Sequence, residues 1–251
     1  QVGRRAEALK LFHEAEQMQQ EYQPNYPLLY SLGGFRYADL LLTPPERAAW
    51  QETALAQPRF ATEVAAHHEA LQVVVERAVA TLEWAEINGV SLLSIALDHL
   101  TLARATLTNT LLTQTEAGAS DLVRAHSEAK AAVAALQQAG LQDDLPLGLL
   151  TRAWLRAITG PLTGPDSAQA DLDEAWDIAA RGPMRLHMAD IHLYRARLFF
   201  REAQYPWESP EADLAAAREL IERCGYGRRR EELADAEAAL AQWRQRPAVG
   251  G

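Results

Sequence analysis

The chain has 251 residues and a formal net charge of −10, from 24 basic and 34 acidic side chains. Its 47 Ala and 36 Leu make up a third of the residues, whereas Val and Ile together number 16, which favours helices over sheet. The acidic excess argues against nucleic-acid binding, and one cysteine excludes an internal disulfide. Neither a membrane-spanning segment nor a signal peptide is predicted. We therefore expect an all-α, cytoplasmic protein of about ten helices.

A spaced motif recurs along the chain: a residue, usually small, is followed four positions later by a second residue and three later by Ala. These positions share one face of a helix, so a paired helix can approach closely. The five copies end at Ala15, Ala78, Ala132, Ala175 and Ala217. The helices that pair with them are predicted at residues 28–43, 92–113, 147–159 and 185–201, and a last polar helix at 231–244.

This alternation predicts one array over residues 1–251, an α-solenoid in which antiparallel helix pairs wind into a right-handed superhelix. Its units span residues 1–26, 27–89, 90–140, 145–181 and 183–225, and a terminal helix covers 229–245. Because no helix precedes the first motif, we expect a C-terminal piece of a longer polypeptide. The segment 44–66 fits least well. Pro44, Pro45 and Pro58 predict a break after residue 43, and then an extra helix, an excursion or a lid.

Five runs, at residues 34–42, 82–86, 96–102, 170–175 and 182–193, resemble parts of a known family. They are similar to the C-terminal tetratricopeptide (TPR) region of bacterial signal-transduction ATPases with numerous domains, the STAND class. The resemblance implies a sensor and autoinhibitory arm that binds an inducer or partner and thereby releases the ATPase. It also implies an N-terminal nucleotide-binding domain in the parent protein. This chain itself has no phosphate-binding P-loop motif.

Metal and catalytic chemistry are not expected. His187 and Asp190 lie near His192 in sequence, but helix positions five apart diverge by about 140° around the axis. Asp98 and His99 are residue types of hydrolytic sites, yet adjacent helical residues also diverge, and no nucleophile motif accompanies them. We therefore predict no metal, no cofactor and no enzymatic activity for this chain.

Polar side chains on the helices expected to line the concave face are the candidate binding residues, because packing alone does not demand them there. They either face a ligand or form an internal hydrogen-bonded network between neighbouring helices, and both alternatives stay open. The set comprises Arg36, Tyr37, Asp39, Asp98, His99, Arg104, Arg152, Arg156, Asp190, His192, Tyr194 and Arg195.

The expected function is recognition of a protein or peptide in the concave groove, as the sensing and autoinhibitory array of a STAND-type ATPase. Arginines on successive helices, such as Arg36 and Arg152, are suited to bidentate binding of the carboxylates of an acidic partner. A free-standing scaffold or adaptor is the first alternative, and an array that binds a small-molecule inducer is the second.

Overall fold

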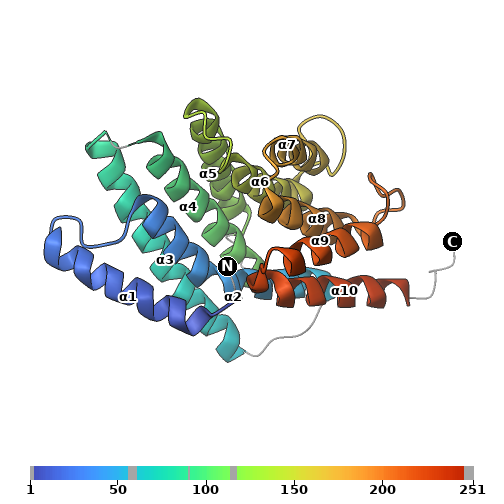
Figure 1. The fold of residues 1–251 in the computed structure, drawn as a ribbon, viewed down its shortest axis with the longest axis horizontal. Coiled ribbons are helices and arrows are strands. Elements are labelled where there is room, and N and C mark those ends of the chain that lie inside the picture. Colours follow the sequence, from blue (N-terminus) through green and yellow to red (C-terminus); the bar gives the residue numbers. More distant parts are fainter. Residues whose placement is uncertain (1–2, 56–60, 90, 114–117, 246–251) are drawn as a thin grey trace.

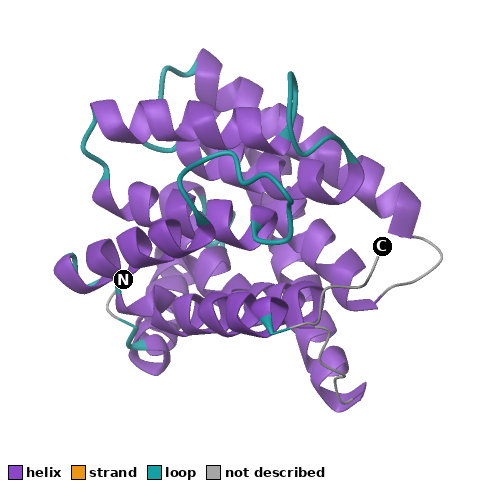
Figure 2. Ribbon diagram, turned by 90° about the vertical axis from the view of Figure 1, so that its right-hand side faces the viewer, coloured by secondary structure: helices purple, strands orange, loops and turns teal. Residues whose placement is uncertain are grey.

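A computed structural model describes residues 3–55, 61–89, 91–113 and 118–245, and within these ranges the chain is helical without any strand (Figures 1 and 2). The predicted all-α class with about ten helices is confirmed. None of the described helices is both long enough and apolar enough to span a lipid bilayer. The elements are α1 (Arg5–Tyr22), α2 (Ser31–Leu55), α3 (Ala61–Ile87), α4 (Leu92–Thr113), α5 (Gly118–Gln138), α6 (Leu145–Thr159), α7 (Ala168–Arg181), α8 (Arg185–Phe199), α9 (Pro210–Arg223), the 3-10 turn η1 (Gly227–Arg229) and α10 (Arg230–Arg244).

The helices form an inner and an outer set. The even-numbered helices contact one another in succession, α2 with α4, α4 with α6, α6 with α8 and α8 with α10, whereas the odd-numbered helices pack on the outside against their chain neighbours. The repeat motif lies on the packed faces, since Ala78, Ala132, Ala175 and Ala217 are buried. Ala15 is only half-buried, and α1 as a whole has no buried residue.

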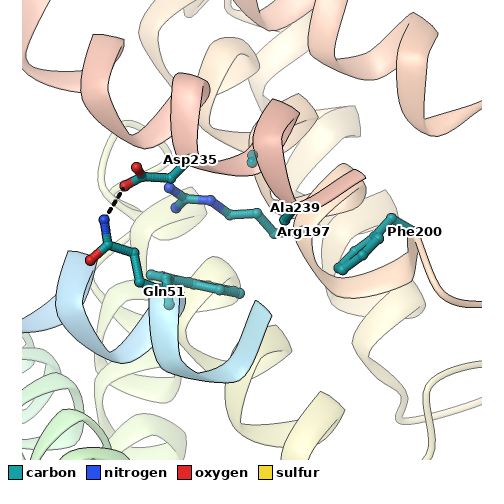
Figure 3. A pocket seen from close by; sticks show the side chains of 7 residues that line it. Gln51, Arg197, Phe200, Asp235 and Ala239 are labelled. Carbon is teal, nitrogen blue, oxygen red and sulfur yellow. Dashed lines mark hydrogen bonds between the residues drawn. The ribbon is translucent and has the colours of Figure 1, made fainter. Parts of the chain in front are cut away.

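The inner set closes on itself. The last helix, α10, returns to contact the first inner helix, α2, and overlaps its second half in Figure 1. Figure 3 shows this junction, where Gln51 on α2 donates a hydrogen bond to Asp235 on α10 (3.0 Å) and Arg197 extends from α8 beside them. The junction leaves a void of only about 10 Å³. The five inner helices therefore form a closed ring of contacts around a packed centre.

The break predicted after residue 43 is wrong, because α2 continues through Pro44 and Pro45 to its end at Leu55. Each proline removes one helical hydrogen bond, but the turns that follow are held by tertiary contacts. Trp50 is buried, and the Arg47 guanidinium donates to Asp235 on α10. Closure of the ring thus stabilises a helix that the local sequence disfavours. Residues 56–60 of the 44–66 segment lie outside the described residues.

Two adjacent glycines at the start of α2 provide a matched test of this packing. A Cβ on Gly34 would lie 2.4 Å from the Leu29 carbonyl oxygen, whereas a Cβ on the exposed Gly33 would meet nothing within 4 Å. We expect Gly34→Ala to lower the free energy of unfolding by roughly 1–3 kcal/mol and Gly33→Ala to raise it by up to about 1 kcal/mol. Urea unfolding of both variants checks this, and equal effects would contradict the close approach of the α1–α2 connection to α2.

Candidate functional site

A buried charge cluster lies between α2, α4 and η1. Arg104 on α4 donates two hydrogen bonds to Glu46 (Nε to Oε1, 2.7 Å; Nη2 to Oε2, 2.8 Å) and a third to Asp39 (2.8 Å). Asp39 also accepts hydrogen bonds from Arg228. Positions 39 and 228 are 189 residues apart in sequence, so this carboxylate joins the two ends of the array.

A second cluster continues the first between α8 and α10. Asp190 on α8 accepts hydrogen bonds from the Tyr226 hydroxyl (3.0 Å) and from Arg229 Nε (2.7 Å). Arg229 also donates to Glu232 (2.6 Å), which in turn accepts from Arg197 (3.0 Å). Across the two clusters the formal charges balance, four positive against four negative. The members are Arg104, Arg197, Arg228 and Arg229 with Asp39, Glu46, Asp190 and Glu232.

The pKa values reflect this mutual neutralisation. Burial raises the pKa of Asp39, but the guanidinium groups of Arg104 and Arg228 outweigh burial and hold this pKa well below its ordinary value. Burial likewise opposes ionisation of Glu232, and the adjacent Arg229 and Arg197 lower its pKa to about 2. Both carboxylates therefore stabilise the fold at pH values above their ordinary pKa, and this contribution is lost progressively as the pH falls below that value.

Aromatic rings fill the remaining centre. Trp50 on α2 stacks on Trp154 of α6, with ring centroids 4.2 Å apart, and Tyr194 of α8 meets Trp50 edge-on. The Arg197 guanidinium lies 4.9 Å from the Trp50 ring centroid. Burial raises the pKa of Tyr194 far above its ordinary value, so the phenol stays neutral. Of the predicted concave set, Asp39, Arg104, Asp190 and Tyr194 thus form an internal network.

Five further members of the predicted set pair with outer helices or connections. His99 lies 2.6 Å from Glu128 on α5, and His192 lies 2.5 Å from Asp213 on α9. The remaining three also have internal partners. Arg152 and Arg156 both donate to the buried Asp171, and Arg195 lies over Trp176 and Trp207. These contacts hold successive helices together, and they leave Arg152 neutralised rather than free for an acidic partner.

Tyr37 and Arg36 lie at the boundary between α1 and α2 and differ in exposure. Tyr37 is buried, stacks on Phe12 of α1 at 5.1 Å and lies 3.2 Å from His13 Nδ1 through its hydroxyl. Arg36 is exposed and lies over the Phe35 ring at 5.9 Å. Tyr37 therefore attaches α1 to the array, whereas Arg36 faces outward.

A cleft of about 620 Å³ lies beside Arg36, between α1, α2 and η1. We call it the Arg36 cleft. Arg5 and the apolar Leu11 and Leu40 also line it. The three acidic groups on its wall are already paired with arginines: Glu7 with Arg4, Asp39 with Arg228 and Glu231 with Arg47. Among the described residues, the guanidinium groups of Arg5 and Arg36 have no hydrogen-bond or ion-pair partner, which leaves the cleft with two uncompensated positive charges.

Asp98, the last member of the set, lies in a separate cavity of about 180 Å³. We call it the Asp98 cavity. Its carboxylate Oδ1 accepts a hydrogen bond from Thr81 on α3 (2.8 Å), and Oδ2 has no hydrogen-bond partner among the described residues. Burial raises the pKa of Asp98 to about 7, and the hydrogen bond from Thr81 only partly offsets this shift.

The aromatic residues that line this cavity were not predicted from the sequence as binding residues. Tyr26 and Tyr30 come from the α1–α2 connection and Trp84 from α3. A signal was present, since Thr81 and Trp84 lie three residues apart and share one face of α3, and Asn88 directly follows its end. The positions of the two tyrosines carried no comparable periodicity.

No family model, curated protein or solved structure matches this chain. Within the described ranges, no three His, Cys, Asp or Glu side chains gather as ligands of a metal ion.

The charge clusters give one stability prediction. Arg104→Met would leave two buried carboxylates without their main counter-charge, so we expect a loss of about 3–5 kcal/mol in the free energy of unfolding. Arg223→Met is the matched control, because Arg223 and Glu219 form an exposed pair one helical turn apart on α9. That change should stay within about 0.5 kcal/mol. A loss below about 1 kcal/mol for Arg104→Met in urea unfolding would contradict the central role of this cluster.

Asp98 gives a pH-dependent prediction. Its pKa is raised in the folded state, so the associated stability is present below the ordinary value of 3.8 and is lost as the pH rises through about 7. Asp98→Asn removes the ionisation. The variant should match the wild-type protein near pH 4 and exceed it by roughly 2–4 kcal/mol above pH 8, at about 1.4 kcal/mol per pKa unit. Thermal unfolding at both pH values measures the difference, and parallel curves would show that Asp98 ionises normally.

Proposed function

We propose that this chain is the partner-recognition and autoinhibitory array of a STAND-type signalling ATPase, and that it binds an acidic peptide segment in the Arg36 cleft. The observation that carries the proposal is the pair of exposed guanidinium groups, Arg5 and Arg36, without internal partners beside the apolar Leu11 and Leu40. Guanidinium groups bind carboxylates through bidentate hydrogen bonds. Neighbouring apolar surface favours a segment that mixes acidic and aliphatic side chains.

The cleft is also placed to couple binding to the shape of the array. Arg228 lines the Arg36 cleft and at the same time holds Asp39, at the point where the ring closes. A carboxylate that enters the cleft competes with Asp39 for this guanidinium. Binding of the partner then favours a state in which η1 and α2 separate, and differential affinity of this kind is what a ligand-driven switch requires.

The assignment to the STAND class rests on the resemblance of the five sequence runs, and the all-helical array is compatible with it. In this proposal the protein is cytoplasmic, and the ATPase domain belongs to the N-terminal part of the parent. A free-standing scaffold would bind the same peptide without controlling an ATPase. ATP hydrolysis by the parent protein, with and without residues 1–251, separates the two: faster turnover after deletion supports autoinhibition, and unchanged turnover supports the scaffold.

Peptide binding is tested with a display library of random 12-residue peptides selected on the purified chain. We expect enrichment of sequences that combine Asp or Glu with Leu. For an enriched peptide, Arg36→Glu should weaken binding at least tenfold in fluorescence anisotropy at 150 mM salt, because it replaces attraction by repulsion. Arg223→Glu makes the same change in net charge on α9, away from the cleft lining, and should alter binding less than twofold. Equal effects of the two variants, or no acidic enrichment, would refute the cleft assignment.

A further inference from the structure

The Asp98 cavity has an unusual combination of walls. Tyr26 and Trp84 meet edge to face, with ring centroids 5.5 Å apart and planes at 75°, so that they form a corner. Tyr30, 40% exposed, adds a third ring near the surface. Aromatic faces carry partial negative charge, and several of them around one space attract a cation.

The acidic group of the cavity also favours a cation. Asp98 is 7% exposed, and its Oδ2 is buried without a hydrogen-bond partner among the described residues. A buried carboxylate in this position costs free energy unless a donor or a positive charge approaches it. Among the described residues that line the cavity there is no basic side chain. Within the part of the chain that the structure describes, the cavity lining therefore gives this acid no counter-charge.

We propose that the Asp98 cavity binds a small organic ammonium ion, with Asp98 as its counter-ion and the rings of Tyr26, Tyr30 and Trp84 as its cation-binding walls. The volume of about 180 Å³ suits a ligand smaller than the drug-sized molecules that occupy pockets above roughly 300 Å³. Ser94 also lines the cavity and offers a hydroxyl partner. A hydroxylated ammonium ion such as choline therefore matches both the charge and the polar lining.

Other ligand classes fit less well. An anion would face the Asp98 carboxylate without any basic group in the lining. A metal ion would find a single carboxylate, since no three potential ligands gather among the described residues. A neutral apolar ligand would fill the space but bury the carboxylate further, which raises its desolvation cost. The ammonium ion is the class that satisfies the rings and the acid together.

Binding at this cavity would join the α1–α2 connection to α3 and α4. Tyr26 and Tyr30 belong to the connection between α1 and α2, whereas Trp84 and Asp98 belong to α3 and α4. A bound cation links these segments and holds the connection against the array. This inference does not depend on the Arg36 cleft, whose lining shares no residue with that of the Asp98 cavity.

The test uses choline and its uncharged isostere 3,3-dimethylbutan-1-ol, measured by isothermal titration calorimetry and by thermal shift at pH 8. At this pH Asp98 is mainly ionised, since its pKa is about 7. Choline should bind at least tenfold more tightly than the isostere. Its binding should also raise the melting temperature by mass action. Asp98→Asn should reduce choline affinity at least tenfold, and Tyr30→Leu should reduce it severalfold.

Asp177→Asn is the matched control, because it removes an exposed carboxylate on α7 and should leave choline affinity unchanged. Far-UV circular dichroism confirms that each variant is folded. Absence of choline binding, equal binding of the neutral isostere, or unchanged affinity in Asp98→Asn would each overturn the proposal. None of these results bears on peptide binding at the Arg36 cleft, so the two proposals fail independently.

Discussion

The closure of the inner helices depends on a set of buried ion pairs with balanced charge. Asp39 of α2 lies between Arg104 of α4 and Arg228 of η1, and therefore connects the beginning of the array to its end. Buried charges stabilise a fold only when they are paired and hydrogen-bonded. Each carboxylate here has at least one guanidinium partner, so the arrangement specifies which helices meet. An open solenoid with the same helices would keep pairs between neighbouring helices, such as Arg104 with Glu46, but would separate Arg228 from Asp39.

This closure explains where the molecule retains binding capacity. The centre of the ring is occupied by its own side chains, and the two candidate sites lie at its margins, one beside α1 and α2 and the other beside the connection between them. The Arg36 cleft borders the closing contact through Arg228, and the Asp98 cavity borders the α1–α2 connection through Tyr26. The first has uncompensated positive charge and the second an uncompensated acid. Opposite charge preferences allow the two sites to bind different classes of ligand.

Much of the fold could be predicted from the sequence, because helical periodicity and breaks are local properties. The predicted helix at residues 92–113 coincides with α4, and Ala132 is fully buried as the motif requires. The course of α2 through Pro44 could not be predicted, since the contacts that hold it come from α10. The same limit applies to the site. The polar residues were identified by type, but Arg228, one of the two partners of Asp39, lies 189 residues away, and no spacing rule reveals it.

The central claim is that Asp39 and Arg228 couple the two ends of the array, and a double-mutant cycle tests it most directly. Asp39→Asn, Arg228→Met and the double variant are compared with the wild-type protein by urea unfolding. The predicted coupling free energy is about 2 kcal/mol, in the range found for residues in direct contact. A coupling energy below about 0.5 kcal/mol would mean that the two changes act independently, and it would contradict closure of the ring through this pair.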